Sequence, residues 1–259
     1  MKVIVVDNYD EMSQVAAELV ADVVKSNPHP MLGLATGSTP IGMYKILADY
    51  CNKKQLSFAN AGSVNLDEYV GLGEDSDQSY VYFMAHNFFD NIDIDRKNTH
   101  IPNGLATDPE QECVRYTALV KQHPQDVQIL GIGSNGHIGF NEPNTPFDSH
   151  THIVKLAEST IRDNARMFAD INDVPRSALT MGIGDIMQAK KIILLANGQN
   201  KAKAIAAGLG LPYMKYTCSD GSRACLCTAT SPRLHRDCRQ SGGFVAEINI
   251  LCFKPQFKQ

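Results

Sequence analysis

Cysteine is scarce in most of this sequence. Of the seven cysteines in 259 residues, only Cys51 and Cys113 precede residue 210. So few cysteines offer no disulfide framework and are typical of a protein from a reducing compartment. Long apolar runs are also lacking, because Asp7 and Asp10 follow the first apolar run before it reaches the length of a signal or membrane-spanning segment. We therefore expect a cytoplasmic protein that does not span a membrane.

Positive charge shows no excess either. The chain carries 24 Lys and Arg against 28 Asp and Glu, a net charge of −4. This balance argues against nucleic-acid or anionic-membrane binding, so any anionic ligand must be bound by local groups. The H-E-x-x-H pattern and the Cys/His spacings of metal sites are missing, as are the glycine-rich nucleotide-binding motifs. We expect no metal and no nucleotide cofactor.

Short apolar runs alternate with longer segments of helical period, which is typical of stacked βαβ units around a mostly parallel sheet. No repeat or linker interrupts residues 1–207, so we expect a single catalytic domain there, an α/β Rossmann-like three-layer sandwich. The predicted strands are 2–6, 31–36, 61–69, 127–133 and 190–198, and the predicted helices are 12–26, 40–50, 108–122 and 201–208. Residues 177–189 are predicted as a strand, a turn and a helix. Ligands of such sheets bind at the carboxyl ends of the strands, so we expect the functional residues in the loops there.

The turn "ATGSTP" (35–40) joins a strand to a helix. Backbone N–H groups at a helix N-terminus, with the hydroxyls of Ser38 and Thr39, suit a phosphate group. An N-capped turn without a ligand is the alternative. Two helix-borne cations, Arg166 and Lys201, are further candidates for an anion, and surface solvation is the alternative for each.

Asp67 and Glu68 end a strand in "NLDEYVGL" (65–72). Adjacent strand residues point to opposite faces, so at most one of the two carboxylates faces the ligand. Two solvated loop acids are the alternative.

The loop "GIGSNGHIGFNEP" (131–143) combines four glycines with His137 and Glu142. Glycine lets the backbone turn sharply and approach a ligand, and a histidine beside a carboxylate is suited to acid-base catalysis. A histidine that only caps a turn is the alternative.

These stretches, together with "TIRDNAR" and "ALTMGIG", resemble the glucosamine-6-phosphate deaminase family over about residues 1–207. The resemblance implies conversion of D-glucosamine 6-phosphate and water to D-fructose 6-phosphate and ammonia by a hydrolase without metal or organic cofactor. It implies that Asp67 moves the C2 proton to C1 and that His137, with Glu142, opens the sugar ring. It also implies a mobile lid over about 145–175 and a phosphate site made of Gly37, Ser38, Thr39, Arg166 and Lys201.

The chain departs from the family pattern in three places. Asn135 stands where some members have aspartate, so Glu142 must do most of the work of charging or orienting His137. His150 stands where arginine is usual. The segment 208–259 is atypical, with five cysteines and little periodicity before 244–253. A shifted reading frame from near residue 208 is one hypothesis, and it would remove the last strand of the sheet.

Three other functions compete with deamination. A 6-phosphogluconolactonase would share the fold and hydrolyse a sugar-phosphate ester, but it needs no base for a C2 proton. A sugar-phosphate-sensing regulator would carry an added DNA-binding motif, for which the sequence before the first strand leaves no room. A folded but inactive homologue is the third, because of the tail. The sequence predicts no oligomeric state.

Overall fold

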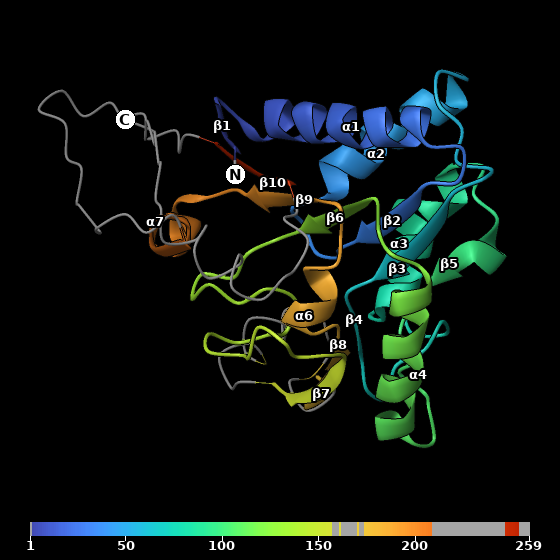
Figure 1. The fold of residues 1–259 in the computed structure, drawn as a ribbon, viewed down its shortest axis with the longest axis vertical. Coiled ribbons are helices and arrows are strands. Elements are labelled where there is room, and N and C mark those ends of the chain that lie inside the picture. The colour runs from blue at the N-terminus through green and yellow to red at the C-terminus, as the bar shows by residue number, and fades with distance from the viewer. Residues whose placement is uncertain (1, 157–160, 162–169, 171–173, 209–246, 254–259) are drawn as a thin grey trace, which may run out of the picture.

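The computed structural model describes residues 2–156, 161, 170, 174–208 and 247–253. Its centre is a seven-stranded sheet in which all neighbouring strands are parallel, in the order β1-β10-β9-β6-β2-β3-β5 (Figure 1). The strands are β1 (Lys2–Val6), β2 (Met31–Leu34), β3 (Gly62–Asn65), β5 (Thr99–His100), β6 (Val127–Leu130), β9 (Lys191–Ala196) and β10 (Glu247–Phe253). This confirms the predicted α/β fold with a mostly parallel sheet.

Helices pack on the sheet, with α1 and α2 together on one side of it and α4 on the other in the view of Figure 1. The predicted helices are found to within a few residues, and the structure adds the short α3. The helices are α1 (Tyr9–Ser26), α2 (Ile41–Asn52), α3 (Tyr80–Asn87), α4 (Pro109–Gln122), α6 (Ile183–Ile186) and α7 (Ala202–Gly208), with single 3-10 turns at Phe89–Asn91, Arg96–Asn98 and Gln199–Lys201. Side chains of Asn8, Ser79 and Asp108 cap the amides that open α1, α3 and α4.

The predicted strand 61–69 is wrong as a single strand. It divides at Leu66 into β3 and β4 (Asp67–Tyr69), and β4 belongs to a second, antiparallel sheet with β8 (Ser177–Thr180) and β7 (His152–Lys155). Leu66 joins the sheets, since its N–H donates to Leu34 and its carbonyl accepts from Met181. This break turns Asp67 out of the main sheet.

The C-terminal strand β10 lies inside the main sheet, between β1 and β9. Val3 is the parallel partner of Ile250, and Ile193 is the partner of Asn249. A shifted reading frame was expected to remove the last strand of the sheet. The structure has a strand at this place. Part of the atypical 208–259 segment completes the sheet of the first 207 residues.

One large apolar cluster fills the space between the sheet and its helices. Its fully buried members include Met12, Leu32, Tyr44, Phe58 and Ile193. A smaller cluster around Tyr69 supports the second sheet. Among the described residues, no helix is both long and apolar enough to span a membrane.

Candidate active site

Asp67 occupies the point where the two sheets meet. It opens β4, lies opposite Thr180 of β8, and is only 5% exposed. Burial of the carboxyl group, and next the negative charge of Glu68, raise the pKa of Asp67 to about 8. A carboxylate with such a pKa is a strong base once it is ionised, which suits proton abstraction from carbon.

Glu68 points away from Asp67, as the alternation of a strand requires. Its carboxylate accepts N–H bonds from Tyr69, Tyr80 and Val81, each at 2.9 Å, and so it binds the first turn of α3. Burial raises the pKa of Glu68 to about 7, against the effect of these three amides. Glu68 is thus engaged by α3, and that no more than one of the two carboxylates faces a ligand stays a prediction.

The glycine-rich loop comes close to Asp67 through Gly139. A Cβ atom at Gly139 would lie 3.2 Å from Oδ2 of Asp67 and 3.1 Å from Oγ1 of Thr180, and the Gly139 φ of +59° also favours glycine. The N–H of Phe140 donates to the same Thr180 hydroxyl at 3.2 Å. Thr180 therefore seats the histidine loop beside the base.

His137 is held by its own loop. Its ring packs on Gly133, where a Cβ would lie 2.3 Å from ring atoms, and its carbonyl accepts from the Gly133 N–H. Burial lowers the pKa of the imidazole; the Glu142 carboxylate opposes this shift and the Lys201 ammonium adds to it. The ring is therefore neutral at pH 7 and able to accept a proton.

Asn135 links His137 to Glu142. Its amide nitrogen donates to Oε2 of Glu142 at 2.6 Å, and its carbonyl oxygen accepts the His137 N–H at 3.1 Å. Asn135 thus orients the backbone of His137, while the charge of Glu142 acts on the ring. The structure brings the predicted residues Asn135, His137 and Glu142 together, and Asn135 forms hydrogen bonds with both of the others.

The turn at 35–40 lies before α2, as predicted. Gly37, with φ +88°, and Ser38 are exposed, so their backbone groups face solvent. The Tyr9 hydroxyl braces the turn: it donates to the carbonyls of Ser38 and Thr39 and accepts the Gly42 N–H at 2.8 Å. Oγ1 of Thr39 donates to Oδ1 of Asn197 at 2.9 Å.

Asn197 and Lys201 belong to the loop after β9, so this hydrogen bond joins two strand ends that are far apart in sequence. Lys201 ends the 3-10 turn Gln199–Lys201 and is near enough to His137 to lower its pKa. The structure therefore brings the predicted cation toward the histidine loop. Arg166 lies outside the described residues.

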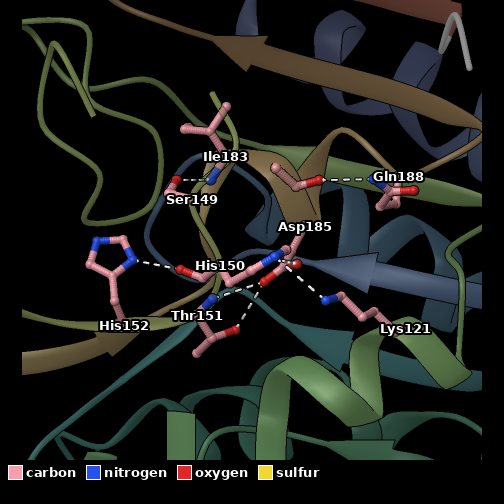
Figure 2. A network of polar contacts seen from close by, with 9 residues as sticks. Lys121, Ser149, His150, Thr151, His152, Ile183, Asp185 and Gln188 are labelled. Atoms are coloured by element: carbon pink, nitrogen blue, oxygen red, sulfur yellow. Dashed lines mark hydrogen bonds and ion pairs between the residues drawn. The ribbon is translucent and has the colours of Figure 1, made fainter. Parts of the chain in front are cut away.

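Part of the predicted lid is tied to α6 (Figure 2). Nδ1 of His150 lies 2.7 Å from Oδ1 of Asp185, a carboxylate that is 1% exposed and also accepts the Thr151 N–H. Nε2 of His150 lies 3.5 Å from Lys121. His150, which stands in place of an arginine, thus gives the buried Asp185 a partner. Most of 157–173 lies outside the described residues.

Sequence reasoning missed three residues that support the site: Tyr9, Thr180 and Asn197. Thr180 lay in the quoted "ALTMGIG" but was assigned no role. Tyr9 and Asn197 reach the turn at 35–40 from distant segments, so no local pattern marks them. Within the described ranges, no three His, Cys, Asp or Glu side chains are grouped closely enough to hold a metal ion.

A buried carboxyl group of raised pKa beside a histidine-bearing loop, next to a parallel α/β sheet, is typical of the active site of an α/β enzyme. A family model described as glucosamine-6-phosphate isomerases/6-phosphogluconolactonase matches residues 7–217, and the chain belongs to this family. The glucosamine-6-phosphate deaminase of Thermoanaerobacter pseudethanolicus is 55% identical over 206 residues, 79% of this chain and 81% of the relative. That of Clostridium perfringens strain 13 is 53% identical over 208 residues, 80% of this chain and 86% of the relative.

Solved structures agree with this membership. A monomeric glucosamine-6-phosphate deaminase has a TM-score of 0.83 and 43% identity, and the match covers 98% of each chain. The 6-phosphogluconolactonase of Thermotoga maritima has a TM-score of 0.66 at 15% identity, covering 98% of this chain and 99% of that chain. At such low identity, this second likeness shows the fold alone.

Proposed function

We propose that this enzyme converts D-glucosamine 6-phosphate and water to D-fructose 6-phosphate and ammonia. The observation that carries the proposal is Asp67, a buried carboxyl group of raised pKa directly beside the histidine loop. Ester hydrolysis needs no base of this kind for a carbon-bound proton. The deaminases that are more than half identical to this chain support the same choice.

The phosphate group binds at the exposed turn before α2. Backbone N–H groups at Gly37 and Ser38, the Ser38 and Thr39 hydroxyls, and the N-terminal dipole of α2 favour a dianion there. Lys201 and Arg166 supply positive charge. The energy of these charge-assisted bonds holds the sugar so that its C1–C2 edge reaches Asp67 and His137.

Ring opening comes first. The neutral imidazole of His137 accepts the proton of the C1 hydroxyl, and the resulting imidazolium delivers a proton to the ring oxygen as the C1–O5 bond breaks. Glu142 stabilises the charged ring during this step, and Asn135 keeps Glu142 in place. Positioned proton transfer of this kind contributes about 10²–10⁴-fold to a rate.

Isomerisation and deamination follow. Asp67 takes the proton from C2 of the open chain as O1 gains a proton, which gives an enolamine. Asp67 then returns the proton to C1 as the amino nitrogen loses one, which leaves an imine at C2. Water adds to C2 and the C–N bond breaks, so that a ketone and ammonia form. The chemistry is thus an isomerisation completed by a hydrolytic step, and it takes place in the cytoplasm. The lid predicted over about 145–175 excludes water from the enolamine.

The test is product release by the full-length protein given glucosamine 6-phosphate, with 6-phosphogluconolactone as the parallel substrate. We expect ammonia and fructose 6-phosphate in equal amounts and no acceleration of lactone hydrolysis. Hydrolysis of the lactone alone would replace the proposal with a lactonase. Turnover of neither substrate by folded protein would indicate an inactive homologue.

A further inference from the structure

Glu68 is a buried acid for which the proposed reaction has no direct use. It is 1% exposed and lies next to the base in β4, on the face opposite the substrate. A group that only needed to cap α3 would not have to be charged, because Ser79 already caps the helix by accepting the Tyr82 N–H at 3.1 Å. The position of a second buried carboxylate beside the base therefore needs another explanation.

Backbone groups around Glu68 favour its ionised form and so oppose the effect of burial. Oε1 accepts from Tyr69 and Tyr80, Oε2 accepts from Val81, and the amino end of α3 adds a favourable dipole. Within the described ranges, no lysine, arginine or histidine forms an ion pair with Asp67 or Glu68. The charge of Glu68 is thus free to act on its neighbour.

Other titratable groups around the pair are neutral at working pH. Tyr69 of β4, Tyr80 of α3 and Tyr116 of α4 interact electrostatically with Asp67, and burial raises the pKa of each phenol, that of Tyr69 to about 12. The opposite strand β8 offers Thr180, which does not titrate. Among the described residues around Asp67, Glu68 is therefore the one whose negative charge raises the Asp67 pKa.

We propose that Glu68 is a positioning residue for the base: once ionised, its carboxylate, held on the amides of α3, makes Asp67 a stronger proton acceptor for the C2 proton. The inference rests on the proposed deaminase function. Its physical basis is that one buried negative charge disfavours ionisation of a second beside it, so that the proton taken from carbon is held more tightly. Stronger basicity speeds removal of a weakly acidic proton.

The test compares Glu68→Gln with Ser79→Ala. Glutamine keeps one oxygen for the Tyr69 and Tyr80 amides and removes the charge, whereas Ser79→Ala removes a cap of α3 and leaves the charge. We expect Glu68→Gln to move the acidic limb of the kcat/KM profile about one pH unit lower, a tenfold change in proton affinity, and to lower the plateau several-fold. Ser79→Ala should leave the limb in place. An unmoved limb in Glu68→Gln, or an equal shift in Ser79→Ala, would overturn the proposal.

A second measurement does not depend on turnover. In wild-type protein with ¹³C-labelled aspartate and glutamate carboxyl groups, the Asp67 signal, assigned by its loss in Asp67→Asn, should titrate above Glu68 and show a second step as Glu68 ionises. A single step independent of Glu68 would contradict the coupling. If this coupling is present while no ammonia is released, the proposed function fails and the electrostatic inference stands.

Discussion

At one end of the site, Asp67 is 5% exposed and lies in a strand, whereas at the other end Gly37 and Ser38 lie in an exposed turn. The base derives its strength from burial, which keeps a charge unstable until substrate arrives. The turn at Gly37 and Ser38, where we propose that the phosphate binds, is open to solvent, so its backbone amides need no burial before an anion arrives. Loss of a single group should therefore affect the rate at the first end and the affinity at the second.

The largest effect is expected from Asp67→Asn. Asparagine keeps the size of the side chain but cannot take the C2 proton, so kcat should fall by at least about 10²–10⁴-fold. Exchange of the C2 proton with deuterated solvent, followed by NMR, should disappear, while competitive inhibition by a non-reactive hexitol 6-phosphate should persist. Exchange at the wild-type rate would remove Asp67 from its role.

Asp67→Asn should also make the protein more stable than wild type, by an amount that grows as pH rises. Burial lifts the folded-state pKa of Asp67 to about 8, above its unfolded value near 4, so the stability contributed by the protonated group is complete below about pH 4. That stability is lost as pH rises through about 8. Thermal unfolding of Asp67→Asn against wild type should show equal stability at low pH and a gain on the order of a few kcal/mol above pH 8. A gain that is constant with pH would contradict the burial of this charge.

The sequence predicted the main elements because their signals are local. Apolar runs marked β2 and β9, and helical period marked α1 and α4, since a buried strand or an amphipathic helix repeats its pattern every few residues. The break at Leu66 was missed because 61–69 reads as one continuous run. Only the backbone bonds of Leu66 to two different sheets reveal the division.

The chemistry of the site was predictable where one loop carries it and not where distant segments meet. His137, Asn135 and Glu142 lie within eight residues of one another, so the motif alone indicated their cooperation. The contacts of Thr180 with the histidine loop and of Asn197 with Thr39 join residues 40 and 158 positions apart. Such contacts depend on strand order in the sheet, which periodicity does not specify.

Gly139 should matter more than its lack of a side chain implies. Gly139→Ala places a methyl group against Asp67 and Thr180 at a positive φ, so the loop must move away from the base. Displacement by about 1 Å can lower a rate by about 10²-fold. Gly131→Ala is the matched control, because a Cβ there meets nothing within 4 Å. Steady-state kinetics that fall equally in both variants would indicate a general disturbance of the loop instead.

The smallest effect belongs to the phosphate end. Asn197→Ala removes the hydrogen bond that fixes the Thr39 hydroxyl, a contact worth about 0.5–1.5 kcal/mol net, so KM should rise about two- to tenfold with kcat nearly unchanged. Thr39→Val should raise KM by at least as much, since it removes the hydroxyl itself. The double variant should be no worse than Thr39→Val, because both changes act on one interaction. Additive effects would mean that Asn197 contacts the substrate through another route, and a fall in kcat instead of a rise in KM would show that the two ends of the site are not separable.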